Sequence, residues 1–166
     1  MTIIAGGESI KSPKFIVDNN VGKLAKWLRM MGYDTLFFRG HDDSDMVATA
    51  LAQNRVLITR DTHIRERRVA STGELKLVFL DSDEPEVQIR QVVQALKLDT
   101  KGSFSLCLEC NEALVERTKE GAKERIPPYV FRTQSQYMEC PACHRIYWRG
   151  THWQRMSKKL DEFVKH

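Results

Sequence analysis

Residues 14–34, KFIVDNNVGKLAKWLRMMGYD, carry the pattern that decides the fold of the first part of this chain. They begin with a short apolar run that ends in Asp18, which predicts a buried strand. Apolar residues then recur at helical spacing up to Gly32, a residue type that commonly follows the end of a helix. This stretch therefore predicts a strand followed by a helix over 21–31. The apolar face of that helix comprises Val21, Leu24, Ala25, Leu28 and Met31.

The same alternation continues to about residue 100. Further strands are predicted over 35–38, 55–59 and 75–80, and helices over 43–53 and 85–98, with a short helix between the third and fourth strands. Strands that alternate with helices predict an α/β fold with a mainly parallel sheet, helices on both faces and right-handed crossovers. The strand segments are apolar without alternation, which fits burial on both sides.

The pattern changes near residues 99–103, where we place a domain boundary. Residues 13–100 form the predicted α/β domain, and residues 101–166 form a smaller part that ends in a predicted amphipathic helix over 152–164. Residues 1–100 contain 14 basic and 14 acidic side chains, so the whole net charge of +4 lies in residues 101–166. An uneven charge of this kind is typical of a part that faces a polyanion.

The composition is that of a soluble protein. Of the 166 residues, 42% are hydrophobic and 29% are charged, which allows a buried core and argues against a disordered or membrane protein. The longest apolar runs are too short to cross a bilayer. The first residues lack the basic start and long apolar stretch of a signal peptide. We therefore expect a cytoplasmic protein without a membrane partner.

Two Cys-x-x-Cys pairs, Cys107 with Cys110 and Cys140 with Cys143, are separated by 29 residues. In a reducing compartment such pairs usually bind metal, and zinc favours four thiolates where its role is structural. Residues 101–166 have few core apolar residues, and a zinc ion would supply the missing stability. The alternatives are two unrelated reduced pairs or a redox-active pair, although a redox motif should open a helix and neither pair does. The cysteines therefore predict a zinc ribbon.

Several aspartates follow the predicted strands. Asp18 follows the first strand, Asp61 follows the third, and Asp43 lies just before the helix that follows the second. Ligands of a parallel sheet bind beyond the carboxyl ends of its strands, so these carboxylates are expected to gather at that edge. Clustered carboxylates repel each other unless a cation neutralises them, and oxygen ligands suit Mg²⁺ or Mn²⁺. Aspartate is also a favoured helix N-cap, so capping stays the alternative for each of them.

Four stretches make the sequence resemble the ribonuclease family named for the C-terminal domain of the Mut-seven exonuclease, a branch of the PIN-like fold. Together they extend from about residue 14 to residue 160. The first and the last are long and specific. The stretches are 18–34 (DNNVGKLAKWLRMMGYD), 55–61 (RVLITRD), 107–111 (CLECN) and 140–153 (CPACHRIYWRGTHW).

The resemblance implies a PIN-like nuclease domain followed by a zinc ribbon, with RNA as the expected partner and Mg²⁺ or Mn²⁺ as the catalytic ion. Asp18 matches the acid after the first strand, Asp61 the acid of the T-x-D motif, and Asp43 the acid that opens the preceding helix. These three aspartates are thus the predicted catalytic and metal-binding residues. No glutamate matches the further acid that many PIN domains carry, and no motif supports Asp81 or Asp83 in its place.

Basic residues near these aspartates are candidates for contacts with phosphate. Lys23, Lys26 and Arg29 form a stripe on the first helix, and Arg60 follows the third strand. Arg149 lies in a segment after the last cysteine that interleaves basic and aromatic residues, a pattern suited to unpaired RNA. Solvated helix faces have the same composition, and the aromatic residues could equally pack the ribbon against the α/β domain, so both interpretations stay open.

Three functions fit the sequence. The first is a metal-dependent ribonuclease that hydrolyses phosphodiester bonds with an aspartate-bound ion. The second is a non-catalytic nucleic-acid-binding zinc-ribbon protein with a degenerate PIN-like site. The third and least favoured is a phosphatase, because Leu77–Asp83 (LVFLDSD) resembles the aspartyl-phosphate motif of haloacid dehalogenase-like enzymes, although here it follows the last strand of the sheet.

Overall fold

The structure, a computed structural model, describes residues 12–102 and 104–165. Its first part contains a four-stranded, fully parallel sheet in the order β2-β1-β3-β4. Because the strands are parallel, they all end at one edge of the sheet, here called the carboxyl edge, and all begin at the opposite, amino edge. The strands are β1 (Phe15–Val17), β2 (Thr35–Phe37), β3 (Val56–Thr59) and β4 (Leu77–Phe79).

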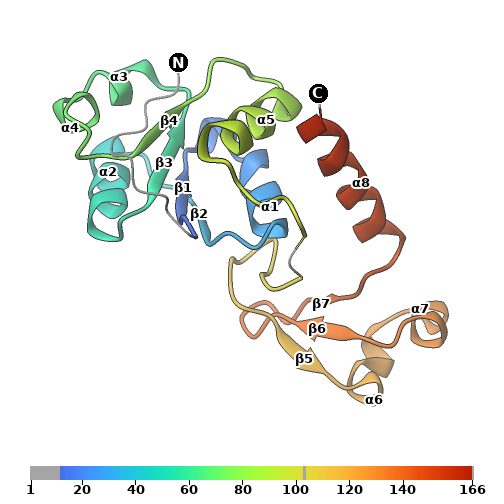
Figure 1. Ribbon diagram of the computed structural model, residues 1–166. Helices are drawn as coiled ribbons and strands as arrows, with labels where there is room; N and C mark the ends of the chain where they lie inside the picture. Colours follow the sequence, from blue (N-terminus) through green and yellow to red (C-terminus); the bar gives the residue numbers. More distant parts are fainter. Residues whose placement is uncertain (1–11, 103, 166) are drawn as a thin grey trace.

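Helices cover both faces of this sheet (Figure 1). Residues of α1 and α5 pack on one face, and residues of α2, α3 and α4 pack on the other. The expected α/β fold, with a parallel sheet between two layers of helices, is therefore confirmed. The elements between and after the strands are η1 (Asn19–Val21), α1 (Lys23–Met30), α2 (Asp43–Ala52), α3 (Thr62–Arg65), α4 (Arg68–Ser71) and α5 (Pro85–Leu96).

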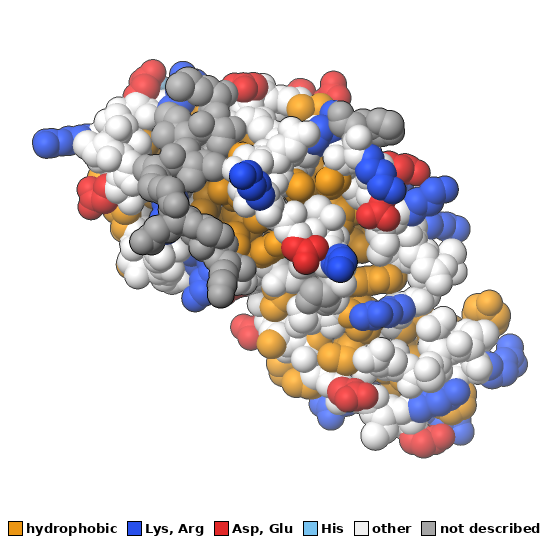
Figure 2. All heavy atoms as spheres, in the orientation of Figure 1, with side chains coloured by type: hydrophobic (Ala, Val, Ile, Leu, Met, Phe, Trp, Pro, Cys, Tyr) orange, Lys and Arg blue, Asp and Glu red, His pale blue; other side chains and the backbone are white. Residues whose placement is uncertain are grey.

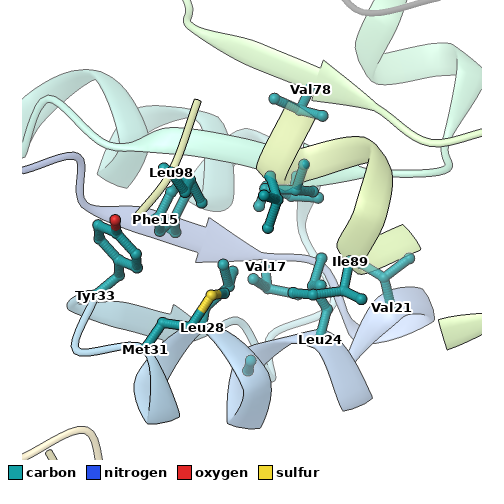
Figure 3. Packing of buried hydrophobic residues seen from close by; sticks show 14 of the residues in the cluster. Phe15, Val17, Val21, Leu24, Leu28, Met31, Tyr33, Val78, Ile89 and Leu98 are labelled. Carbon is teal, nitrogen blue, oxygen red and sulfur yellow. The ribbon is translucent and has the colours of Figure 1, made fainter. Parts of the chain in front are cut away.

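Each strand contributes to two hydrophobic cores, because successive side chains of a strand point to opposite faces. Phe15 and Val17 of β1 pack with residues of α1 and α5, as Figure 3 shows, while Ile16 lies in the second core with residues of α2 and α3. All three side chains are at most 1% exposed. This two-sided burial is the reason that the strand segments are apolar without alternation.

The second part of the molecule is a ribbon with a three-stranded antiparallel sheet in the order β5-β6-β7. Three short helices join β5 to β6 and enclose a small core around the fully buried Tyr137. The sequence does not predict these helices, because they are too short for a hydrophobic period to be visible. The elements are β5 (Val115–Arg117), α6 (Lys119–Ala122), η2 (Lys123–Arg125), α7 (Pro128–Thr133), β6 (Tyr137–Glu139) and β7 (Ile146–Tyr147).

The last helix, α8 (Thr151–Lys165), returns from the ribbon to the α/β part (Figure 1). Leu160 is 2% exposed and belongs to the same core as α1 and α5. The Phe163 carbonyl accepts a hydrogen bond from Arg90 of α5 at 2.7 Å, and its ring packs edge-on against Trp27 of α1. This helix therefore closes the α/β core, although its position in the sequence groups it with the ribbon. In the described part of the chain, no helix is long and apolar enough to cross a membrane.

Candidate functional site

The four cysteines converge at the junction of the two parts. The sulfurs of Cys107, Cys110, Cys140 and Cys143 all lie within 4.8 Å of one another, and none of the four forms a disulfide. The Cys107 and Cys143 sulfurs are 3.7 Å apart. A tetrahedral zinc ion with Zn–S bonds of about 2.3 Å holds two thiolates about 3.8 Å apart. The donor set and its spacing therefore fit a zinc ion, as the sequence analysis predicts.

Two equivalent backbone turns present these sulfurs. The Asn111 amide donates to the Cys107 carbonyl at 3.0 Å, and the His144 amide donates to the Cys140 carbonyl at 2.9 Å. The residue after each second cysteine is left-handed, with φ of 64° at Asn111 and 62° at His144. Asparagine and histidine tolerate this conformation better than most residues. His144 thus closes a turn and is not one of the clustered ligands.

Tyr147 supports the first cysteine of the cluster. Its hydroxyl lies 3.1 Å from the Cys107 sulfur. Burial raises the pKa of Cys107, but hydrogen bonds from the Tyr147 hydroxyl and from the amides of Cys110 and Glu109 outweigh it and lower the pKa to about 7. Since the thiolate is the form that binds metal, these hydrogen bonds favour Cys107 as a ligand. The pKa of Cys110 is instead raised, chiefly by its hydrogen bond with Cys143.

Arg29 connects the first cysteine turn to the α/β part through hydrogen bonds. This side chain is 7% exposed, and its guanidinium donates to the carbonyls of Thr35 at 2.9 Å, Leu108 at 2.7 Å and Glu109 at 3.3 Å. Burial lowers the pKa of Arg29 from its very high ordinary value. The guanidinium therefore joins α1, the start of β2 and the cysteine turn.

Asn111 makes a second set of hydrogen bonds between the ribbon and the α/β part. Its side-chain oxygen accepts from the Thr35 amide at 2.8 Å, and its side-chain nitrogen donates to Asp34 at 2.7 Å. Asp34 in turn accepts from Arg55 at 2.8 Å. Because Asp34, Thr35 and Arg55 lie at the starts of β2 and β3, the ribbon is docked at the amino edge of the sheet.

The predicted phosphate-binding residues have different surroundings. Lys23 is exposed, whereas Lys26 forms an ion pair with Glu109 at 2.7 Å. Arg60 is half-buried, and the exposed Arg149 has its guanidinium carbon 5.3 Å from the centre of the Phe104 ring. Arg29 is occupied by backbone carbonyls, as described above. Phosphate binding by the exposed cations stays a prediction.

At the carboxyl edge, Thr59 links the two aspartates of the neighbouring strands β1 and β3. Asp18 is 6% exposed, and its Oδ2 accepts from the Thr59 hydroxyl at 2.7 Å. The same hydroxyl oxygen accepts from the Asp61 amide at 3.0 Å. One threonine therefore fixes the Asp18 carboxylate and the start of the Asp61 turn. Nothing in the sequence singles out Thr59 beyond its place in the T-x-D motif.

Asp18 and Asp61 cap the helices that follow them, as the alternative interpretation of the sequence predicts. Asp18 Oδ1 accepts from the Asn19 amide at 2.7 Å, and Asp61 Oδ1 accepts from the His63 amide at 2.8 Å. Asp61 Oδ2 accepts no hydrogen bond from a described residue. The cap of α2 is Asp42, so the half-buried Asp43 carboxylate is left without a hydrogen bond or ion pair within residues 12–102 and 104–165.

The three aspartates share an edge but are not packed together. Arg67 donates to Ser44 at 3.3 Å, which brings the first turn of α2 beside the segment that follows Asp61. In the described part of the chain, however, the cysteines are the one group of three or more acidic, histidine or cysteine side chains whose ligand atoms lie within 4.8 Å of one another. The expected crowding of Asp18, Asp43 and Asp61 is thus absent, and their metal binding stays a prediction.

The chain matches the model of a known protein family. A family model described as the Mut7-C RNAse domain matches residues 13–160, which include both the aspartates of the carboxyl edge and the four cysteines. No curated protein and no solved structure matches the chain.

Proposed function

Since the chain belongs to the Mut7-C RNAse domain family, we propose that it is a metal-dependent ribonuclease whose reaction centre is the carboxyl edge of the parallel sheet. The family gives it a nuclease-like, RNA-related role. The finer proposal is that Asp18, Asp43 and Asp61 hold Mg²⁺ or Mn²⁺, and that the four cysteines hold a structural zinc ion.

The link from Thr59 to Asp18 and Asp61 carries this proposal. It orients a buried carboxylate and an adjacent one at the same edge, and Asp61 keeps an oxygen that accepts no hydrogen bond from a described residue. Mg²⁺ usually takes one or two carboxylates and completes its shell with water and phosphate oxygens, so a dense acidic cluster is not required. When bound, such an ion lowers the pKa of a coordinated water and polarises the phosphodiester.

The remaining tasks fall to basic side chains near that edge. Lys23 is exposed at the start of α1, and η1, which directly precedes this helix, is capped by Asp18. Arg60 separates Thr59 from Asp61 in the chain. We assign to both the task of holding phosphates on either side of the scissile bond.

Cleavage of a labelled single-stranded RNA by the purified protein, with Mg²⁺ or Mn²⁺ added, tests the proposal. Asp18→Asn and Asp61→Asn should each lower the rate at least about a hundredfold, because even groups that only orient metal ligands are worth about 10–100-fold. Asp43→Asn should act in the same direction. Asp45→Asn, an exposed change in the same first turn of α2, is the matched control and should cleave normally. Cleavage at the wild-type rate by Asp18→Asn, Asp43→Asn and Asp61→Asn, as by the control, would overturn the proposal.

A second candidate is a nucleic-acid-binding protein without catalytic activity. It is favoured by the local capping bonds of Asp18 and Asp61 and by the lack of a tight acidic group among the described residues. Salt-sensitive RNA binding with no metal-dependent cleavage, on substrates of varied sequence and structure, would support it.

A cytoplasmic location is proposed as well, on the ground of the sequence. Microscopy of the tagged protein in cells tests this.

A further inference from the structure

A cavity of about 560 Å³ lies where the α/β part, the ribbon and α8 meet. Its walls include Trp27 of α1, Tyr147 of β7, Trp148 and Trp153, with Lys26 and Lys159 among them. Cavities of about 300–1,000 Å³ are typical of ligand sites. The chain has 3 tryptophans, and all of them line this one cavity.

Two of the aromatic walls pack against neighbouring rings. Trp153 packs edge-on against Phe104, with ring centres 4.8 Å apart. Trp27 packs in the same manner against Phe163 at 5.3 Å. Rings that are already fixed lose little freedom when a planar ligand stacks on them, and every nucleobase has a face suited to such stacking.

A second cavity of about 440 Å³ adjoins the first and extends it along α1. The two share Lys26, Trp27, Glu109 and Met156, and the second reaches Gly22 and Lys23. Those last two residues directly follow η1, which Asp18 caps. With 8 residues, α1 is about 12 Å long, so the two cavities form one groove from the ribbon at the amino edge towards the aspartates at the carboxyl edge.

The charge of the groove favours an anion. Glu109 is the one acid among the described residues that line either cavity, and it is paired with Lys26. Figure 2 shows, on the face that it presents, hydrophobic side chains between the two parts, with both basic and acidic side chains around them. Six basic side chains line the groove: Lys23, Lys26, Arg29, Arg39, Arg145 and Lys159.

We propose that this groove binds an unpaired segment of RNA, with one base stacked among the tryptophans and the following phosphates along α1 towards Asp18. The inference rests on the proposed function for the identity of the strand. In this proposal the ribbon helps to bind one base. Because the ribbon is docked at the amino edge, opposite the aspartates, the RNA strand itself spans the distance from that base to the aspartates.

Tryptophan fluorescence of the full-length protein reports on the cavity directly. Titration with a short unlabelled single-stranded RNA, in the Asp61→Asn background to prevent cleavage, should quench this emission. Lys159→Ala should weaken binding severalfold and lower the slope of log K against log salt by about 0.7, the value for one lost phosphate contact on a single strand. Lys158→Ala is the matched control, since Lys158 is its exposed neighbour on α8 and does not line either cavity.

Trp153→Ala should weaken RNA binding further, and Trp153→Phe should restore part of it, with melting curves showing that both variants are folded. Equal affinities for Lys159→Ala and Lys158→Ala, or RNA binding without a change in tryptophan emission, would overturn the inference. So would equal affinity for a mononucleotide, which would indicate a small-molecule site. Quenching in a protein that never cleaves RNA would leave the inference intact and refute only the nuclease proposal.

Discussion

The Thr59 hydroxyl donates to Asp18 Oδ2 at 2.7 Å and joins the ends of β3 and β1, the two central strands of the sheet. The bond lies in the interior, since Thr59 is fully buried and Asp18 nearly so. Its acceptor is a carboxylate, and hydrogen bonds to charged groups are worth about 1.5–3 kcal/mol. The link is therefore both a stabilising contact and the means by which Asp18 is oriented.

Thr59→Val removes the link but keeps the carboxylates themselves, so it tests both roles of the link. We expect a loss of about 1–3 kcal/mol in the free energy of unfolding and a fall of about 10–100-fold in metal-dependent cleavage. Thr59→Ser keeps the donor and should recover most of the cleavage. Urea unfolding and RNA cleavage measure the two effects. Normal cleavage by Thr59→Val would show that the link does not position the carboxylate.

Tyr147→Phe should make zinc binding more sensitive to acid. Protons compete with zinc for the thiolates, and the Tyr147 hydroxyl is one of the donors that bring the pKa of Cys107 down to about 7 against the effect of burial. Without that donor the Cys107 pKa rises, so zinc should be released at a higher pH and bind about tenfold more weakly. A colorimetric zinc indicator during a pH titration measures the release. An unchanged midpoint would show that the Tyr147 contact does not influence the metal site.

Two substitutions of Asn111 should separate its backbone role from its side-chain role. Asn111→Gly keeps the left-handed turn and removes the contacts with Thr35 and Asp34, whereas Asn111→Ala removes the contacts and strains the turn as well. Both should speed hydrogen exchange at the Thr35 amide, but the glycine variant should retain zinc better. Equal zinc loss in the two variants would mean that the turn conformation at Asn111 does not matter.

Asp34 should contribute to stability in a pH-dependent manner. Burial alone would raise its pKa, but hydrogen bonds from Arg55 and Asn111 outweigh this and lower the pKa below its ordinary value. A group with a lowered pKa stabilises the fold above the pKa of the unfolded chain, about 4, and loses that contribution as the pH falls through its folded value. Asp34→Asn should therefore be less stable than the wild type near pH 7, with a smaller difference near pH 3. Thermal melts across this range measure it, and a difference that does not change with pH would contradict it.

The parts of the fold that could be predicted from the sequence are those in which burial imposes a period. Residues 15–17 are buried on both faces and are therefore uniformly apolar, while Leu24 and Leu28 recur at helical spacing because one side of α1 faces the core. The cysteine cluster was equally predictable, since a tetrahedral site requires paired ligands at short spacing. Four-residue helices such as α6 show no period and were missed.

The roles of individual polar residues depend on long-range contacts that leave no local pattern. Asp42 and Asp43 are neighbours of the same type, and only the backbone decides that Asp42 caps α2. Lys23, Lys26 and Arg29 form one basic stripe, yet the first is exposed, the second is paired with Glu109 and the third is buried. No local pattern indicates that the ribbon docks at the amino edge, since Arg29 and Asn111 make that contact with backbone groups and with the Asp34 carboxylate.

Arg29 is where the phosphate-binding prediction and the structural role give opposite expectations. A phosphate-binding arginine would be replaceable by lysine with little loss of stability. An arginine that donates to three carbonyls would not, because an ammonium group cannot reproduce the planar fork of donors. We therefore expect Arg29→Lys to lower the free energy of unfolding by about 2–3 kcal/mol. Lys23→Ala, on the exposed side of the same helix, should change it by less than about 0.5 kcal/mol while weakening RNA binding. If Arg29→Lys instead leaves stability intact and weakens only RNA binding, the guanidinium faces the ligand and the ribbon is held by other contacts.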